Sequence, residues 1–458
     1  MTQEIGSVLT SVNPATLEVV AETTISTPAE IEKTIAAATA ALPTWRRGLP
    51  ARQDLARLIT GQIHAHADAL AELLTREQGK PLAEAKQEIW IAAEAFRAAA
   101  DVEWETSRTQ QVLGGHHATV VHAPYGVIAA IVPWNFPIYL ATAKIAPALI
   151  AGNTVIVKPA ETVSRVVTEF VEILSSVLPE GVIGLVAGGP SVGQALVTDR
   201  RVRKVSFTGS TQIGREIIRQ SAEAVTPLTL ELGGNDPAIL LADADIAQAA
   251  ERLAAGAFMN AGQMCIAPKR VYVPRAQHSD FTEALEVHVR QRVVGDGLES
   301  GTTMGPLHTR AQRDFVEKLI ADAIAGGARV VTGGPSAAKG ELPGHFLAPT
   351  VLTDLGDDAD VVRLEQFGPV LPIIAYDNLD EVLTRIDGQE FGLGASVWSA
   401  DTDRARQVAE GIEAGTVWIN KHNALDVNVP FGGVKASGFG REGGRAGIDD
   451  FLITRVIN

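Results

Sequence analysis

Apolar positions recur at helical spacing over the first hundred residues of the chain, where alanine is also frequent. Thr27 is followed three residues later by Glu30, and Pro28 comes directly after Thr27, which together are typical of a helix start. The pattern therefore predicts a helix that begins at Pro28, and further helices over residues 55–78 and 82–100.

The pattern changes at residues 106–124, where two glycines separate short alternating segments and predict a β-hairpin. Beyond the hairpin, apolar strands alternate with helical segments, which predicts an α/β fold with parallel sheets and helices on both faces. We expect strands at 126–132, 154–158, 182–187, 204–208, 227–232 and 237–241, and helices at about 141–150, 164–178, 193–198 and from the glycine turn 209–214 to residue 221.

A second alternating unit begins near residue 246, and the tail at 448–458 is expected to form one terminal strand. In this unit we expect helices at 246–261, 280–293 and 310–325, and strands at 270–274 and near Val330, Val351 and Ile373.

Composition narrows the function classes. The chain has 458 residues, 46% of them apolar, which suits a globular protein of two or three folding units. A net charge of −15 argues against partners such as nucleic acid or an anionic membrane surface. The most apolar stretch, 126–151, contains prolines and an asparagine and is not expected to span a membrane.

The chain contains one cysteine, Cys265, which excludes an internal disulfide and a multi-cysteine metal site, and we expect no metal. A lone thiol suits a reducing compartment, and the N-terminus lacks the pattern of a signal peptide. We therefore expect a cytoplasmic protein.

Two residues stand out as chemical candidates. Cys265 follows a helical run and is flanked by Gly262 and Pro268, which fix a turn around the thiol; the alternative is a small buried apolar residue. Glu231 ends an apolar strand and precedes two glycines, so its carboxylate is expected in the crevice where parallel sheets bind ligands. The alternative is an ion-paired or surface glutamate.

Two loops add a donor and an anion site. Asn135 lies between Pro133 and Pro137, so its amide is a fixed donor or part of a local turn. Residues 207–214 lead from a strand through Gly209 into a helix, an arrangement that can cradle phosphate at the helix N-terminus.

Taken together, these segments resemble the aldehyde dehydrogenase superfamily along essentially the whole chain, with the NAD(P)-dependent, non-acylating branch the closest in pattern. The separation of Glu231 from Cys265 (265 − 231 = 34 residues) also resembles that family. The motifs, in family order, are Pro133–Pro137, Lys158–Glu161, Phe207–Gly214, Glu231–Gly234, Gly262–Cys265, Glu365–Pro369 and Pro430–Glu442.

The resemblance implies oxidation of an aldehyde to its carboxylic acid through a thiohemiacetal and a thioester on Cys265. Asn135 and the Cys265 backbone N–H would hold the oxyanion, and Glu231 would activate the hydrolytic water. Glu231 favours hydrolysis over the related branch that releases acyl-coenzyme A. Lys144 and Glu442 fall where the family places a proton relay; the alternatives are a surface lysine and a tail ion pair.

The resemblance also implies a nicotinamide cofactor. Glu161 lies where a carboxylate would accept hydrogen bonds from the adenosine ribose, which favours NAD, with NADP still possible. The residues implied in cofactor binding are Val132, Trp134, Lys158, Glu161, Gly209, Ser210, Leu232, Glu365 and Phe367.

The substrate is expected to be a medium-sized or bulky apolar aldehyde, because the implied tunnel offers no cation or anion clamp. Ala143 is small where many family members carry a bulky aromatic, which would widen the tunnel. The tunnel residues implied by the resemblance are Phe136, Leu140, Ala143, Met264, Ile266, Asn423, Leu425 and Phe431.

The family comparison implies a Rossmann-like NAD-binding domain (1–105 and 125–233) and an α/β catalytic domain (234–447). A small β oligomerisation element (106–124 and 448–458) would form a homodimer or homotetramer, since an unpaired tail strand invites association. Two other functions remain open from the residues: a binding protein that kept the fold without catalysis, and a reductase of acyl phosphates or acyl thioesters.

Overall fold

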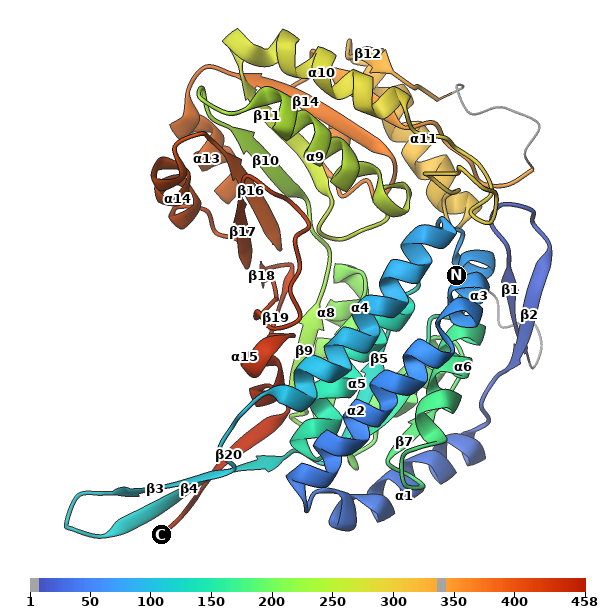
Figure 1. Cartoon of the computed structure of the whole chain (residues 1–458), viewed down its shortest axis with the longest axis vertical. Helices are drawn as coiled ribbons and strands as arrows, with labels where there is room; N and C mark the ends of the chain where they lie inside the picture. Colours follow the sequence, from blue (N-terminus) through green and yellow to red (C-terminus); the bar gives the residue numbers. More distant parts are fainter. Residues whose placement is uncertain (1–7, 336–342) are drawn as a thin grey trace.

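The computed structural model describes residues 8–335 and 343–458. Figure 1 shows a lower body of helices and strands from the first half of the chain, an upper body from the second half, and a ribbon of strands that projects from the lower body.

The lower body is built on a six-stranded sheet with the order β19-β9-β8-β5-β6-β7. Strands β5 to β9 are parallel, and β19, from the far end of the chain, joins β9 antiparallel. The strands are β5 Val127–Ile131, β6 Thr154–Lys158, β7 Ile183–Leu185, β8 Val202–Thr208, β9 Leu228–Glu231 and β19 Gly438–Phe439. The helices are α1 Pro28–Trp45, α2 Leu49–Ala65, α3 Ala67–Gln78, α4 Leu82–Asp101, α5 Pro137–Ala151, α6 Ser164–Ser175, α7 Pro190–Thr198 and α8 Thr211–Ser221.

Local sequence signals explain where these helices begin. The Thr27 side chain accepts from the Glu30 amide, and the Glu30 carboxylate accepts from the Thr27 amide, so α1 starts at Pro28 as expected. Helix α5 begins at Pro137, four residues before the expected start, because proline fits the first helical position. The residues Phe136 to Leu140 therefore form its cap and first turn.

The upper body contains a seven-stranded sheet with the order β12-β13-β14-β11-β10-β16-β17, parallel except for the edge strand β12. Its strands are β10 Asp236–Leu240, β11 Pro268–Pro274, β12 Arg329–Thr332, β13 Thr350–Thr353, β14 Val370–Tyr376, β16 Gly394–Trp398 and β17 Thr416–Ile419. Its helices are α9 Ile246–Phe258, α10 His278–Arg290, α11 Arg310–Ala325, α12 Asp360–Arg363, α13 Leu379–Asp387 and α14 Thr402–Glu410, with 3-10 turns η1 Met259–Gly262 and η2 Arg275–Gln277.

Three smaller β units complete the fold. The ribbon has the order β20-β4-β3, and it projects from the lower body in Figure 1. The unpredicted hairpin of β1 and β2 packs beside α3 and α6. The strands of these units are β3 Ser107–Gln111, β4 His117–Pro124, β20 Leu452–Ile457, β1 Val8–Val12, β2 Val19–Thr24, and the short pair β15 Phe391–Gly392 and β18 Val434–Lys435.

The prediction of a single strand over 448–458 was wrong for the first residues of that range. Ile448 belongs to helix α15 Gly444–Asp449 and is buried against the lower body, and strand β20 begins only at Leu452. The backbone turns there because Gly443 and Gly444 both adopt positive φ, which breaks the strand pattern.

The two sheets meet at the expected domain boundary, since β9 ends at Glu231 and β10 begins at Asp236. Assigning all of 234–447 to the second domain was wrong, however. Strand β19 extends the lower sheet, and α15 packs on α4 and α5 of the lower body. The end of the chain thus ties the two bodies together.

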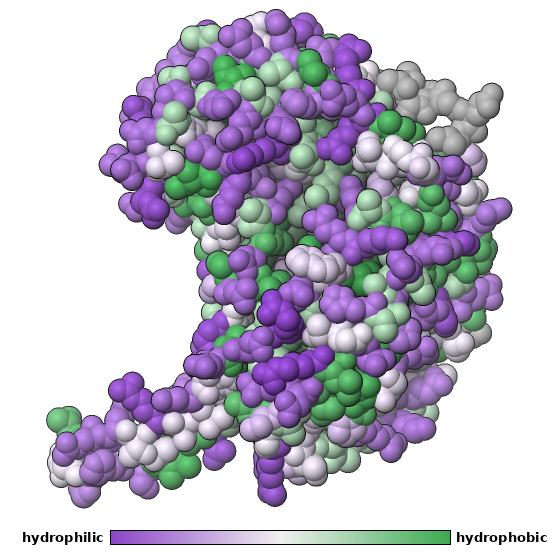
Figure 2. Space-filling view, in the orientation of Figure 1, coloured by the Kyte–Doolittle hydropathy of each residue, from purple (hydrophilic) through white to green (hydrophobic). Residues whose placement is uncertain are grey.

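The surface in Figure 2 is mostly hydrophilic, with scattered hydrophobic side chains, and its outline is concave between the upper body and the ribbon. Among residues 8–335 and 343–458, no helix combines the length and apolar character that a membrane span needs. The same residues contain no cluster of three histidine, cysteine or acidic side chains that could hold a metal ion.

Candidate active site

The candidate site lies at the carboxyl ends of the lower sheet, facing the upper body. In register, Ile131 pairs with Lys158 and Phe207, and Thr208 pairs with Glu231, so these strand ends share one edge. Two cavities open there, and Asn135, Thr208 and Cys265 line both. The thiol-bearing residue therefore stands between two separate approaches.

The Cys265 loop is held in an unusual backbone conformation. Asn260, Ala261 and Gly262 have φ of 50°, 54° and 73°, so the chain turns left-handed just before the thiol. A side chain at Gly262 would collide with the Gly368 carbonyl, 2.2 Å from an added Cβ. The expected turn around the thiol is therefore present, and glycine is required in it.

The environment of Cys265 favours the neutral thiol. Burial raises its pKa well above the usual range, and the carboxylates of Glu365, Asp236 and Glu231 raise it further. Lys269 acts in the opposite direction. A thiolate there requires a base or an arriving electrophile to draw the proton away.

Glu231 is buried, and both of its carboxylate oxygens lack a hydrogen-bond partner among the described residues. Burial raises its pKa well above the usual range, and Glu442 raises it further, while Lys144 and Arg441 oppose the shift. An unpartnered carboxyl of raised pKa is a suitable proton acceptor for water. The ion-paired or surface alternative for Glu231 is wrong.

The glycines of the 430–440 segment leave room for this carboxyl. An added Cβ at Gly432 would lie 2.9 Å from Glu231 Oε1, and one at Gly438 would lie 1.9 Å from the Leu230 carbonyl. Close approach of the tail segment to β9 thus explains why this motif is rich in glycine.

Lys144 and Glu442 form a buried ion pair, with Nζ and Oε1 2.5 Å apart. Lys144 Nζ also donates to Thr208 Oγ1 at 2.7 Å. Glu442 is fixed by a two-way backbone bridge to Phe431. The surface alternative for Lys144 is wrong, since its side chain is fully buried, and the two residues lie beside Glu231.

Asn135 is buried, and its Nδ2 donates to the Gln263 carbonyl at 3.1 Å. Because a side-chain amide carries two N–H groups, one remains for a ligand in the cavity. Asn135 thus contacts the loop that carries Cys265, at Gln263, two residues before the cysteine.

The larger cavity is mostly apolar and contains all but one of the expected tunnel residues. No lysine or arginine is among the described residues that line it, whereas Glu84, Glu88, Glu231 and Glu442 are. The expected residues found in the lining are Phe136, Leu140, Met264, Ile266, Asn423, Leu425 and Phe431.

Ala143 was wrongly placed in the tunnel. It lines a separate small cavity, together with alanines of α4, on the other side of Tyr139. Tyr139 lies one helical turn before Ala143 and borders both cavities, so its ring separates them. The small residue at 143 therefore does not widen the approach to Cys265.

The second cavity also borders Cys265. It is lined by six expected cofactor residues, and Ser210 caps α8 beside it by accepting from the Ile213 amide. Glu365 Oε1 accepts from the Gly234 amide at 2.9 Å, which holds this carboxylate at the cavity wall. The six residues are Trp134, Gly209, Ser210, Leu232, Glu365 and Phe367.

Val132, Lys158 and Glu161 lie outside the lining of this cavity. Lys158 ends β6, and its Nζ is 3.7 Å from Glu161 Oε1. Val132 is buried directly after β5 and donates its amide to the Lys158 carbonyl. Their contact with a cofactor stays a prediction.

Comparison with known proteins identifies the family. The model of the aldehyde dehydrogenase family matches residues 2–457. The chain belongs to the aldehyde dehydrogenase family.

Relatives agree with this assignment. The NADP⁺-dependent succinate-semialdehyde dehydrogenase of Escherichia coli K12 is 41% identical over 92% of this chain and 88% of its own. The phenylacetaldehyde dehydrogenase of Pseudomonas fluorescens is 38% identical over 97% of this chain and 91% of its own. A mutant aldehyde dehydrogenase C of Pseudomonas syringae, solved with NAD⁺ and octanal, matches with a TM-score of 0.94 and 36% identity over 100% of this chain and 94% of that one.

Family membership confirms three expectations from the sequence: the superfamily, its α/β fold, and the enzyme class of NAD(P)-dependent aldehyde dehydrogenases. Sequence reasoning missed part of the substrate cavity, because most of these residues come from helix faces and loops without a motif, and Thr208 was interpreted only as part of the 207–214 phosphate cradle. The missed lining residues are Glu84, Gln87, Glu88, Ile91, Tyr139, Thr208, Met259, Ala424 and Val427.

Proposed function

We propose that this enzyme oxidises an uncharged, apolar aldehyde to its carboxylic acid with NAD, through a thioester on Cys265 that Glu231 helps to hydrolyse. The observation that supports this most strongly is that Cys265 and Asn135 border both an apolar cavity and a cofactor-side cavity. An aldehyde in one cavity and a hydride acceptor in the other can therefore both reach Cys265.

The first step is attack of Cys265 Sγ on the aldehyde carbon, which forms the C–S bond of a thiohemiacetal. The thiol proton leaves toward Glu231 or water. The oxygen that gains negative charge would be stabilised by the free Nδ2–H of Asn135 and the Cys265 amide. Removal of one such donor typically costs about 10²–10³ in rate.

Oxidation of the thiohemiacetal to the thioester requires loss of a hydride, for which a bound nicotinamide is the acceptor. Water then attacks the thioester carbon while Glu231 takes its proton. The C–S bond breaks, the acid leaves, and the sulfur regains a proton. The net change is aldehyde, water and oxidised cofactor to acid, reduced cofactor and a proton.

Lys144 and Glu442 would carry that proton away from Glu231. The raised pKa of Glu231 is due in part to Glu442, so the two carboxyls do not hold negative charge independently. The ion pair of Glu442 with Lys144 offers a buried path from the site to the α5 side of the lower body.

The residues of the cofactor-side cavity suit a dinucleotide. Helix α8 presents its N-terminal amides beside Gly209 and Ser210, where a pyrophosphate is stabilised by the helix dipole. A side chain at Gly209 would lie 2.4 Å from the Phe207 ring, so the chain must stay open there. Glu365 is placed to accept from a ribose hydroxyl, and Glu161 disfavours a 2′-phosphate, which is why we propose NAD over NADP.

The charges around the larger cavity disfavour an anionic substrate, and its mostly apolar lining favours an uncharged one. A carboxylate-bearing semialdehyde needs a cation partner, and the described lining offers only acidic and neutral side chains. The octanal complex of the Pseudomonas syringae relative shows that this fold accommodates a long apolar chain. The succinate-semialdehyde name of the Escherichia coli relative is the competing suggestion.

The decisive experiment measures cofactor reduction with octanal, phenylacetaldehyde, betaine aldehyde and succinate semialdehyde, each with NAD and with NADP. The proposal expects the highest kcat/KM for octanal or phenylacetaldehyde with NAD. Cys265→Ala should abolish turnover. Preference for succinate semialdehyde or NADP would refute the substrate or cofactor part, and unchanged turnover of Cys265→Ala would refute the mechanism.

We also propose a homodimer or homotetramer assembled through the ribbon. Every residue of β3 is exposed, and β20 leaves one edge unpaired. Because a nucleophilic thiol must stay reduced, we propose the cytoplasm as its compartment.

A further inference from the structure

A buried ion pair lies behind the Asn135 loop. Lys80 Nζ is 2.5 Å from Glu88 Oε2, and both side chains have 0% exposure. Lys80 follows α3 and Glu88 lies in α4, so the pair belongs to the helical layer of the lower body. Two charges removed from water are costly, and a buried ion pair often stabilises a fold no more than an apolar pair of similar volume. The pair therefore calls for a role other than stability.

The Lys80 ammonium is turned toward the catalytic loop. Its Nζ donates to the Asn135 main-chain carbonyl at 2.7 Å and lies 3.7 Å from the centroid of the Phe136 ring. Its contacts with Glu88, Asn135 and Phe136 place it directly behind the amide that faces the aldehyde. Lys80 itself lines neither cavity.

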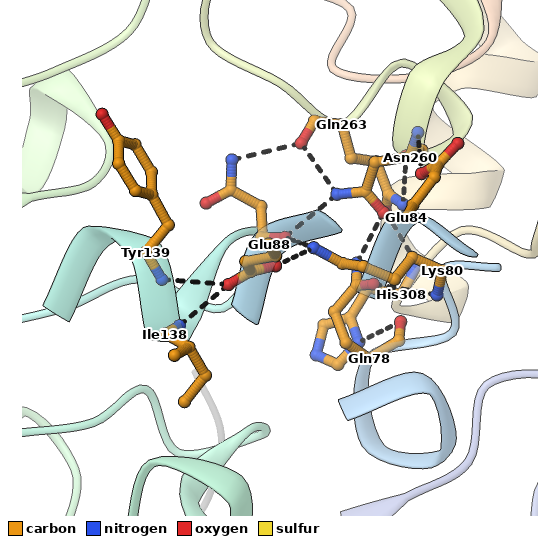
Figure 3. A network of polar contacts seen from close by, with 10 residues as sticks. Gln78, Lys80, Glu84, Glu88, Ile138, Tyr139, Asn260, Gln263 and His308 are labelled. Atoms are coloured by element: carbon orange, nitrogen blue, oxygen red, sulfur yellow. Dashed lines mark hydrogen bonds and ion pairs between the residues drawn. The ribbon is translucent and has the colours of Figure 1, made fainter. Parts of the chain in front are cut away.

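The other Glu88 oxygen fixes the helix that follows this loop. Oε1 accepts from the backbone amides of Ile138 and Tyr139 at 2.9 and 3.2 Å (Figure 3). These are first-turn amides of α5, whose own N-cap, Phe136, has no side-chain acceptor. Glu88 thus supplies the missing cap from α4, with its negative charge at the positive end of the helix.

The same network reaches the nucleophile loop. Asn260 Nδ2 donates to the Asn135 carbonyl at 3.0 Å and to the Gln263 carbonyl at 3.3 Å. Gln78 Nε2 donates to Asn260 Oδ1 at 2.9 Å, which fixes the orientation of that amide. The Asn135 carbonyl is therefore held by two donors, Lys80 and Asn260.

We propose that the Lys80–Glu88 pair is a positioning device that aims the Asn135 amide at the oxyanion. This inference rests on the proposed function, in which Asn135 is an oxyanion donor. A donor displaced by about 0.5 Å loses much of its effect, because transition-state stabilisation depends on fixed geometry. Lys80 holds the Asn135 carbonyl, Glu88 holds the next helical turn, and the side-chain amide between them has little freedom.

The test uses the pair Lys80→Met/Glu88→Gln, which removes both charges but keeps an acceptor oxygen for the α5 amides. We expect kcat to fall about 10- to 100-fold, with KM for the cofactor unchanged. In an Asn135→Ala background the same two substitutions should lower kcat less than about twofold, because the amide that the ion pair positions is already absent. Lys86→Met, which breaks an exposed ion pair on the same helix, is the control and should leave kcat unchanged.

Alkylation of Cys265 by iodoacetamide is the second readout, because that substitution develops no oxyanion. Its rate should stay within about twofold in the Lys80→Met/Glu88→Gln enzyme, whereas general damage to the site would lower it in parallel with kcat. Lys80→Met alone replaces the double variant if the latter does not fold, because it removes the donor to the Asn135 carbonyl, and the same loss of kcat, absent in the Asn135→Ala background, is expected.

Three results would overturn the inference: unchanged kcat in the folded variants, an equal loss in both backgrounds, or a parallel loss of alkylation. One other result would contradict the proposed function itself. If Asn135→Ala alone retains normal turnover, the oxyanion role fails, and the positioning role falls with it.

Discussion

At the scale of single residues, the site combines two acids whose pKa values the surroundings raise. Burial raises the pKa of both the Cys265 thiol and the Glu231 carboxyl, and the negative charge of Glu231 raises the pKa of the thiol further. The resting enzyme therefore has little thiolate. Reactivity depends on an aldehyde that accepts the sulfur while a neighbour accepts the proton.

Glu231→Gln should separate the two halves of the reaction. Acylation needs the thiol and a hydride acceptor, whereas hydrolysis needs a base for water, so we expect a burst of reduced cofactor followed by turnover lowered about 10²-fold or more. Stopped-flow absorbance measures the burst, and intact-mass spectrometry detects the acyl-enzyme.

The sign of the pH dependence follows from the raised pKa of Glu231. The carboxylate, not the acid, is the base, so wild-type hydrolysis should rise as pH increases through that pKa, and the Gln variant should lack this rise. Glu413→Gln, an exposed carboxylate on the upper body, is the control. Full activity of Glu231→Gln with coenzyme A as acyl acceptor would contradict the hydrolytic assignment.

Leu425→Arg should change substrate charge preference. Leu425 is 37% exposed and lines the substrate cavity, so an arginine there keeps its charge solvated while it reaches a carboxylate. We expect kcat/KM for succinate semialdehyde to rise about tenfold and that for octanal to fall. Leu425→Gln controls for size and polarity, and an equal effect of both substitutions would contradict the charge argument.

Individual site residues were predictable to different degrees. Cys265, Glu231 and Asn135 follow strand or helix ends and were recognisable from flanking glycines and prolines. Ala143 was misplaced because the family resemblance shows only that this residue is small. It does not show that Tyr139, one helical turn earlier, lies between Ala143 and the substrate cavity. Lys80 carries no local signal, since its partners lie 8 and 55 residues away.

At the scale of elements, the strand ends of both sheets contribute residues to the site. Polar groups buried between the sheets destabilise the fold when they are charged. Asp236 begins β10, and its Oδ1 accepts from the Gly394 amide at the start of β16. Its Oδ2 has no hydrogen-bond partner among the described residues, and His422 Nε2 lies 3.9 Å away. Burial raises the pKa of this carboxyl to about 8.

Asp236→Asn should stabilise the enzyme at alkaline pH. The folded-state pKa of about 8 lies above the reference value of 3.8, so the wild-type fold loses stability as pH rises between these values. Asparagine keeps the acceptor for Gly394 without the charge. We expect Tm to rise by about 5 °C or more at about pH 9, with a smaller gain at about pH 5, by scanning calorimetry.

Asp377→Asn is the control for this prediction, because Arg275 lowers the pKa of that exposed carboxyl and the opposite dependence is expected. A Tm gain for Asp236→Asn that is independent of pH would show that packing, not charge, dominates at Asp236.

Helices and strands were predictable where the apolar positions follow a regular spacing, as in α1, β5, β6 and β8. The expected starts failed where a tertiary contact decides the boundary. At α5 the cap that Glu88 supplies from α4 adds to the start signal of Pro137, and α15 interrupts the expected tail strand because it packs against the lower body. Neither contact is visible in local sequence.

At the scale of the whole molecule, the last part of the chain links the upper body, the lower body and the ribbon. The segment from β18 to β20 passes Glu231, adds α15 to the lower body and then enters the ribbon, where β20 pairs with β4. Sequence patterns predicted the ribbon's strands but not this path. Assembly through the ribbon would therefore act on a segment that also borders the active site.

The ribbon's exposed apolar end should be the assembly surface. Val456 and Ile457 are 63% and 58% exposed on the edge strand β20, where a second copy can cover both the side chains and the unpaired strand edge. We expect wild-type enzyme to sediment as a dimer or tetramer, and Val456→Lys/Ile457→Lys to shift it toward smaller species, because like charges would face each other across a symmetric interface. Val287→Lys, at a 57% exposed valine of α10 in the upper body, should leave the mass unchanged. A wild-type monomer, or a lysine variant of unchanged mass, would contradict assembly through the ribbon.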